Sequence, residues 1–235
     1  MPNNAKQDLI FLDTETTGIE NGRLIQLAYK KQGDSAMFVE YYKPPVPIDI
    51  EAMSVHHITE KKVADKTPFE RSPTHGALSA LLANSILVAH NAKFDIGILE
   101  REGIDTPHYI CTMRIAKTMY DYPQYKMQYL RYLWDIDNSA ANAHDAEGDV
   151  IILEKVFEHM LEEYTKEHHL SEEETIKKFV EISENPMLLR KANFGKYTGK
   201  TFEEIKTIDR PYLEWMGTLK DKDEDFIYTV NHYLK

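Results

Sequence analysis

The spacing of apolar residues along the chain alternates between the two-residue period of strands and the 3.6-residue period of helices. Short apolar or strand-favouring runs predict strands at 9–12, 24–29, 36–41 and 86–89. Helical spacing and helix-ending residues predict helices at 72–84, 92–102, 112–119, 127–133 and 144–164. The first three strands are joined by short turns, which predicts an antiparallel meander. The whole order predicts an α/β fold, with helices packed against a mixed sheet.

The pattern changes after the last of these helices. Residues 162–184 are charge-rich and weakly apolar, which is typical of a connecting arm. We therefore expect a main domain at 1–166, a charged linker helix at 167–189 and a small C-terminal unit at 190–235. A unit of this size is below what normally folds without a staple or a partner surface. We expect it to dock on the main domain or on a second subunit, so a homodimer is one possible assembly.

Composition narrows the class of protein. The chain has 235 residues, of which 42% are hydrophobic and 29% charged, as in an ordinary globular protein. No apolar run approaches the roughly 20 residues of a membrane span, and the first residues lack a secretory signal pattern. The single cysteine, Cys111, excludes an internal disulfide framework and fits a reducing cytoplasm, where we expect the protein to act.

The net charge of −11 argues against a protein that coats nucleic acid by bulk electrostatics. It leaves room for a nucleic-acid enzyme, because catalytic acids that hold divalent cations become locally positive.

Candidate chemistry begins at an acid pair that follows the first apolar run. Asp-x-Glu occurs three times, at Asp13–Glu15, Asp49–Glu51 and Asp145–Glu147. Only the first pair follows a buried strand, where the period of two turns both carboxylates to one face. Two carboxylates in that position repel each other unless cations lie between them.

Further ligands are expected at the ends of other elements. Asp95 lies one turn into a predicted helix, and His144 and Asp149 lie at the start of the long one. Oxygen ligands select magnesium or manganese over zinc. Four carboxylates suit two ions about 3.5–4 Å apart, which clamp both oxygens of an in-line phosphoryl displacement. A histidine at the edge of such a site can accept a proton from the attacking water.

The chain resembles the DEDD superfamily of 3′–5′ exonucleases, in the DnaQ-like branch that carries a histidine in its third motif. The resemblance rests on "FLDTETTG", "VAHNAKFD" and "HDAEGD", which occur in the family's order. "VHHIT" resembles a further element of the family, with His57 where glycine is usual. The segment "FGKYTGKTFEEI…RPYLEWM" resembles the small region that follows the nuclease domain in one bacterial branch. The resemblance implies a ribonuclease-H-like sheet of about five strands.

The same resemblance implies a role for each motif residue. Asp13 bridges both ions, Glu15 and Asp149 bind them from either side, and Asp95 reaches one ion through water. His144 is the general base. The implied substrate-binding residues are Thr14, Thr17, Gly18, His56 and Asn91. Every metal-binding position of the family pattern is filled, which predicts an active enzyme.

Simpler interpretations stay open for several of these residues. Asn91 could cap the helix that carries Asp95, and Cys111 is best explained as a small buried hydrophobe. Residues 190–200 hold four basic residues and no acid, which fits either a phosphate-binding patch or a solvated turn.

We expect metal-dependent removal of nucleoside 5′-monophosphates from the 3′ end of DNA, with two magnesium ions for which manganese can substitute. The preferred substrate is single-stranded DNA or a frayed 3′ end, because the site must hold an unpaired terminus, and a role in DNA repair would follow. One alternative is a 3′–5′ exoribonuclease, since the sequence cannot show whether a 2′-hydroxyl fits. The other is a proofreading or binding subunit of a polymerase assembly.

Overall fold

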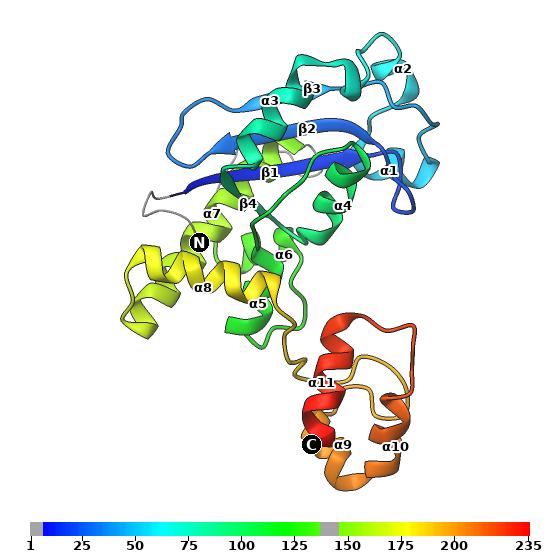
Figure 1. Ribbon diagram of the computed structural model, residues 1–235, viewed down its shortest axis with the longest axis vertical. Helices are drawn as coiled ribbons and strands as arrows, with labels where there is room; N and C mark the ends of the chain where they lie inside the picture. Colours follow the sequence, from blue (N-terminus) through cyan, green and yellow to red (C-terminus); the bar gives the residue numbers. More distant parts are fainter. Residues whose placement is uncertain (1–6, 137–145) are drawn as a thin grey trace. The chain divides into compact units, whose positions relative to one another are not determined.

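A five-stranded mixed sheet forms the centre of the larger of two units in the computed structural model, which describes residues 7–136 and 146–235 (Figure 1). The spatial order is β3-β2-β1-β4-β5, and β1 is antiparallel to β2 but parallel to β4. The strands are β1 (Asp8–Thr16), β2 (Leu24–Lys31), β3 (Phe38–Tyr41), β4 (Ser85–Ala89) and β5 (Tyr109–Cys111). The predicted α/β fold with a mixed, ribonuclease-H-like sheet is confirmed.

Helices cover both faces of this sheet. In the larger unit they are α1 (Ile50–His56), α2 (Glu60–Val63), the 3-10 turn η1 (Phe69–Arg71), α3 (Pro73–Leu82), α4 (Lys93–Arg101), α5 (Thr112–Met119), α6 (Met127–Leu133), α7 (Ala146–His168) and α8 (Glu172–Glu184). Among the described residues, no helix is both long and apolar enough to cross a membrane.

The central strand β1 distributes its side chains between two cores. Leu9 and Phe11 pack with α7, where Phe11 meets the ring of Phe157 edge-to-face at 5.4 Å. Ile10 and Leu12 point to the other face and pack with α3 and α4. Because side chains alternate along a strand, every odd-numbered position of β1 faces α7. This alternation decides which acids of β1 can meet an acid on α7.

Helix α8 packs on the larger unit and differs from the charged linker helix expected at 167–189. Its apolar stripe, made by Ile176, Phe179 and Val180, belongs to the core that also contains α7. Ser183 accepts a hydrogen bond from the Cys111 backbone at 2.8 Å. Helix α8 therefore covers the edge of the sheet at β5, which would otherwise be exposed. The two compact units divide between Glu184 and Asn185. The stripe is narrow and flanked by charge, which is why it reads as weakly apolar in sequence.

The smaller unit, Asn185–Lys235, has its own core and is drawn in orange and red in Figure 1. Its helices are α9 (Phe202–Ile208), α10 (Arg210–Met216) and α11 (Glu224–Leu234). The buried residues of the core are Ala192, Phe202, Ile205, Leu213, Met216, Phe226 and Val230. Thr201 and Glu204 form a capping box at the start of α9. Each helix therefore contributes apolar side chains to one compact core.

Candidate active site

Two of the expected metal ligands lie on the part of β1 that extends beyond β4. Pairing of β1 with β4 ends at Phe11, whereas pairing with β2 continues to Thr16. The sequence had indicated that Asp13 and Glu15 follow the end of the first strand. The structure instead places both residues within β1. Both occupy odd positions, so they project on the face that carries α7.

Asp149 completes a group of three acids from the opposite side. It lies in the first turn of α7 and is buried, with only 8% of its surface exposed. One carboxylate oxygen from each of Asp13, Glu15 and Asp149 lies within 4.8 Å of the others. Three like charges this close repel one another unless cations neutralise them, and an all-oxygen donor set suits magnesium or manganese. The residues present thus fit divalent cations of this kind.

Gln128 on α6 is a site residue that the sequence did not reveal. Its side-chain amide donates a hydrogen bond to Oδ1 of Asp149 at 3.0 Å. Arg131, one turn later, donates to Oε1 of the same Gln128 at 3.3 Å. The guanidinium therefore orients the amide, and the amide holds one oxygen of the carboxylate. Glutamine at the start of a short amphipathic helix carries no sequence signal for this contact.

Asp95 lies outside the three-acid group in the part of the chain that the structure describes. Its side chain is 3% exposed and accepts a hydrogen bond from Thr14 Oγ1 at 2.8 Å. Burial raises the pKa of Asp95 to about 7, and the bond from Thr14 opposes this rise. Thr14 projects from β1 on the face opposite Asp13 and Glu15, because it stands at an even position. The hydroxyl that was expected to meet substrate is therefore engaged with this carboxyl.

Thr17 and Gly18 shape the loop that leaves β1. The backbone N–H of Thr17 donates to Arg23 at 2.9 Å, and its hydroxyl accepts from the Arg23 backbone at 3.0 Å. A Cβ added at Gly18 would collide with the carboxylate of Asp49. Both residues are buried, so the structure assigns them contacts within the protein. Their expected contacts with a nucleotide remain a proposal.

His56 and His57 end helix α1. His56 is buried, and its Nδ1 accepts from the Ile58 backbone at 2.9 Å, while Nε2 has no partner of good geometry in the described residues. Burial lowers the pKa of His56, and the nearby Thr16 backbone opposes this only in part. His57 adopts a left-handed φ of 58°, a conformation that favours glycine. Glycine would adopt this geometry without strain, which fits the glycine that is usual in the element that this segment resembles.

Asn91 lies between β4 and α4 with its side chain exposed. Its φ is 66°, and the residue that caps α4 is Ala92, without a side-chain cap. The interpretation of Asn91 as a side-chain cap was therefore wrong.

His144, the expected general base, lies outside the described residues. Cys111 is 3% exposed and unpaired by any disulfide, which confirms it as a small buried side chain.

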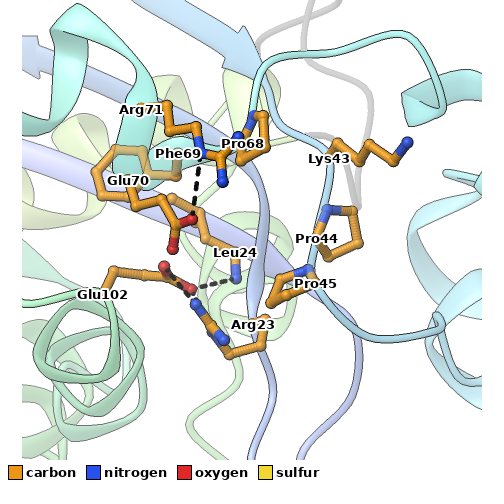
Figure 2. A pocket seen from close by; sticks show the side chains of 10 residues that line it. All are labelled: Arg23, Leu24, Lys43, Pro44, Pro45, Pro68, Phe69, Glu70, Arg71 and Glu102. Carbon is orange, nitrogen blue, oxygen red and sulfur yellow. Dashed lines mark hydrogen bonds and ion pairs between the residues drawn. The ribbon is translucent and has the colours of Figure 1, made fainter.

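A pocket of about 240 Å³ opens beside the start of β2, and none of the expected ligands lines it (Figure 2). Arg23 forms a two-pronged ion pair with Glu102 in its wall, at 2.7 and 3.0 Å. Arg71 lies 3.7 Å from Glu70 across another part of the wall. The first pair joins the residue after α4 to the start of β2, so we interpret it as structural.

Fold and acid group together define a ribonuclease-H-like domain with its acids on the central strand and on the helix that packs against it. Residues 10–157 match the family model described as "Exonuclease", which covers more than half of the chain. The chain therefore belongs to the exonuclease family. Residues 193–217 match a second model, "Exodeoxyribonuclease X-like C-terminal". Both matches confirm the resemblance that the motifs indicated.

Curated relatives extend the likeness over nearly the whole chain. Exodeoxyribonuclease 10 of Escherichia coli K12 is 28% identical over 235 residues, which is 97% of this chain and 99% of that protein. The DNA polymerase III subunit epsilon of Buchnera aphidicola (from Acyrthosiphon pisum) is 32% identical, over 66% of this chain and 72% of that protein.

Solved structures share the fold. A structure of exonuclease X in complex with 5′ overhanging duplex DNA matches with a TM-score of 0.57 at 22% identity. The match covers 74% of this chain and 99% of that one. Escherichia coli exonuclease I in complex with a dA16 oligonucleotide matches with a TM-score of 0.52 at 17% identity, over 64% of this chain and 40% of that one.

Proposed function

We propose that this protein is a metal-dependent 3′–5′ exodeoxyribonuclease that releases nucleoside 5′-monophosphates from single-stranded or frayed 3′ ends. The observation that carries the proposal is the convergence of Asp13, Glu15 and Asp149 on a fold of the exonuclease family. A DNA substrate is supported by the name of exodeoxyribonuclease 10 and by the duplex DNA bound in the solved structure of exonuclease X.

The acids would hold two magnesium ions, or manganese in their place, and these would supply charge stabilisation for an in-line displacement. Asp13 would serve both ions, the role that the family resemblance implies for it. Asp95 would act through water, in keeping with its bond to Thr14 and its place outside the three-acid group. Gln128 would hold Oδ1 of Asp149 and so fix the orientation of this carboxylate toward the ions.

The reaction adds water oxygen to the terminal phosphorus while the bond from phosphorus to the 3′ oxygen breaks. The shortened strand keeps a 3′ hydroxyl, and the released nucleotide keeps the 5′ phosphate. His144 would accept the proton of the attacking water. Asn91 is exposed between β4 and α4, and with Thr17, Gly18 and His56 it would border the terminal nucleotide.

DNA and RNA strands of one sequence, each labelled at the 5′ end, test the substrate and polarity. We expect a ladder on DNA that shortens from the 3′ end, with nucleoside 5′-monophosphates as the product on thin-layer chromatography. A ladder on RNA alone would transfer the protein to the exoribonucleases. Absence of any ladder would favour the alternative of a binding subunit in a polymerase assembly.

The role of His144 has a separate test. His144→Ala should lower the single-turnover rate by about 10²–10⁴-fold, the usual contribution of a positioned base. Binding of Mn²⁺, measured by calorimetry, should stay unchanged, because the histidine holds no ion in this proposal. Loss of Mn²⁺ binding in the variant would refute the assignment as base and make His144 a ligand.

A further inference from the structure

We propose that the smaller unit binds single-stranded DNA on a surface formed by the loop 190–200 and the exposed ring of Trp215. This site lies in residues 185–235 and is distinct from the acid group of the larger unit. Residues 185–235 contain nine Lys or Arg and eight Asp or Glu, whereas the rest of the chain contains 19 and 31. The strongly acidic balance of the protein therefore stops where the smaller unit begins.

The loop 190–200 is ordered by backbone bonds and carries cations on both of its arms. Lys191 bridges to Thr201 as in an antiparallel pair. The Ala192 backbone donates to Lys200 at 2.8 Å, and the Gly199 backbone donates to Ala192 at 2.7 Å. Lys191 and Lys200 thus lie on opposite arms of a closed turn. A closed turn can present its cations to phosphates with little ordering cost.

Acids that face the loop are occupied by contacts within the unit. Asp209 accepts from Lys196 Nζ and from the hydroxyl of Tyr197, both at 2.9 Å. The side chain of Glu204 accepts from the Thr201 backbone at 2.7 Å as part of the capping box of α9. Each carboxylate is therefore engaged by donors of its own surroundings. Lys196 offsets the charge of Asp209, whereas Glu204 keeps its charge near Lys191 and Lys200.

A continuous set of rings joins the loop to helix α10. Tyr197 meets Tyr212 edge-to-face at 5.1 Å, and Tyr212 lies 5.0 Å from the ring of Trp215. The hydroxyl of Tyr212 accepts from the Lys196 backbone at 3.1 Å, and a Cβ at Gly195 would collide with that hydroxyl. The loop is thus built around Tyr212. Trp215, at the other end of the set, is 47% exposed.

An exposed indole that is joined to a basic loop by a series of ring contacts matches the two needs of single-stranded nucleic acid. Bases stack on aromatic side chains, while a positive surface follows the phosphates. A duplex would keep its bases stacked on each other and gain nothing from the ring. Single-stranded nucleic acid is therefore the ligand that fits both features, and the choice of DNA rests on the proposed function. Single-stranded DNA is the strand that the exonuclease proposed above would shorten.

Binding of a fluorescent oligothymidylate to the full chain in EDTA, followed by anisotropy, tests the role of Trp215. Without cations the acids of the larger unit repel phosphates, so binding reports on other surfaces. We expect Trp215→Ala to weaken binding at least about fivefold, the lower end of the effect of one stacked base. Trp215→Tyr should retain binding. Tyr228→Ala is the matched control, because Tyr228 is 45% exposed in the same unit.

Salt dependence tests the cations. Lys191→Gln with Lys200→Gln should reduce the slope of log affinity against log salt by about 1.4, or 0.7 for each phosphate that the protein no longer neutralises. Lys220→Gln with Lys235→Gln removes equal charge from the same unit and should leave the slope unchanged. Equal effects in both pairs, equal effects of Trp215→Ala and Tyr228→Ala, or no binding by the unchanged protein would each overturn the proposal. None of these results depends on DNA cleavage, so they leave the proposed activity to its own test.

Discussion

Gln128 shows how one uncharged side chain can prepare a ligand for a cation. A carboxylate has two oxygens, and an ion binds best when the orientation of the group is already set. Gln128 donates to Oδ1 of Asp149, and Arg131 keeps the amide in the orientation that can donate. Asp149 is thus already ordered when the protein has folded, so metal binding does not have to order it.

We predict that Gln128→Leu weakens Mn²⁺ binding about 10–100-fold, the usual effect of losing a partner of a metal ligand. Leucine has similar size but no donor, so Asp149 would lose the bond that orients it. Calorimetric titration with Mn²⁺ measures the effect. Gln124→Leu is the control, since Gln124 is exposed in the segment just before α6. Equal affinity in both variants would remove Gln128 from the site.

His90 is a buried histidine that links stability to pH. Its Nε2 donates to the Tyr125 carbonyl at 2.8 Å, so Nδ1 must accept from the Thr112 hydroxyl at 2.9 Å. Burial, with a smaller contribution from Lys117, lowers the pKa of His90 to about 4. Because the folded pKa is below the unfolded pKa of about 6.5, the unfolded chain binds more protons between these values. The contribution of His90 to stability must therefore fall as the pH falls through this range.

The expected loss between pH 7 and pH 5 is about 2 kcal/mol from this group alone. His90→Gln cannot gain the proton, so its free energy of unfolding should lack this loss over the same range, whatever the other groups contribute. Urea unfolding of the metal-free protein at several pH values measures the difference. His168→Gln, at an exposed position of α7, should keep the full dependence. An unaltered pH dependence in His90→Gln would contradict the account.

At the scale of elements, the sequence predicted those with strong periodicity. The runs that became β1, β2, β4, α4 and α7 were predicted, because each combines an apolar pattern with a clear boundary. The three-residue β5 was not, since a strand this short owes its form to its neighbour β4. Helices α1 and α2 were also missed, because they follow a proline-rich stretch and bury few residues.

The residues of the candidate site also differ in whether the sequence could predict them. Asp13, Glu15 and Asp149 could be predicted because they stand at fixed places in motifs on strongly patterned elements. The partner of Asp149 could not, since Gln128 comes from a different helix and the contact depends on how α6 and α7 pack. The bond between Asp95 and Thr14 joins residues 81 positions apart and likewise needs the folded sheet.

Helix α8 provides the test at this scale. Phe179 is fully buried against α7, so Phe179→Ala should lower the free energy of unfolding of the larger unit by about 3–5 kcal/mol. Lys178→Ala, on the exposed side of the same helix, should change it by less than about 0.5 kcal/mol. Denaturant titration compares the two variants. Similar small effects would restore α8 to the role of a loosely attached linker.

At the scale of the whole molecule, the two units differ in net charge, in keeping with the functions proposed for them. The larger unit is acidic, yet its proposed chemistry acts on a polyanion, so local cations must offset that charge at the acid group. The smaller unit carries nearly balanced charge and would add an independent contact with the strand. On this account metal removal abolishes cleavage, while binding through the smaller unit survives.

The measurement that tests the central claim most directly compares Asp13→Ala with the unchanged protein on 5′-labelled DNA in Mg²⁺, Mn²⁺ or EDTA. Asp8→Ala is the control, because Asp8 lies on the same strand and pairs with Lys31 at the surface. We predict cleavage from the 3′ end with either cation and none in EDTA. Asp13→Ala should lose at least about 10³-fold in rate, since the ions supply several kcal/mol of transition-state stabilisation. Cleavage by folded Asp13→Ala at the rate of Asp8→Ala would contradict the assignment of the site.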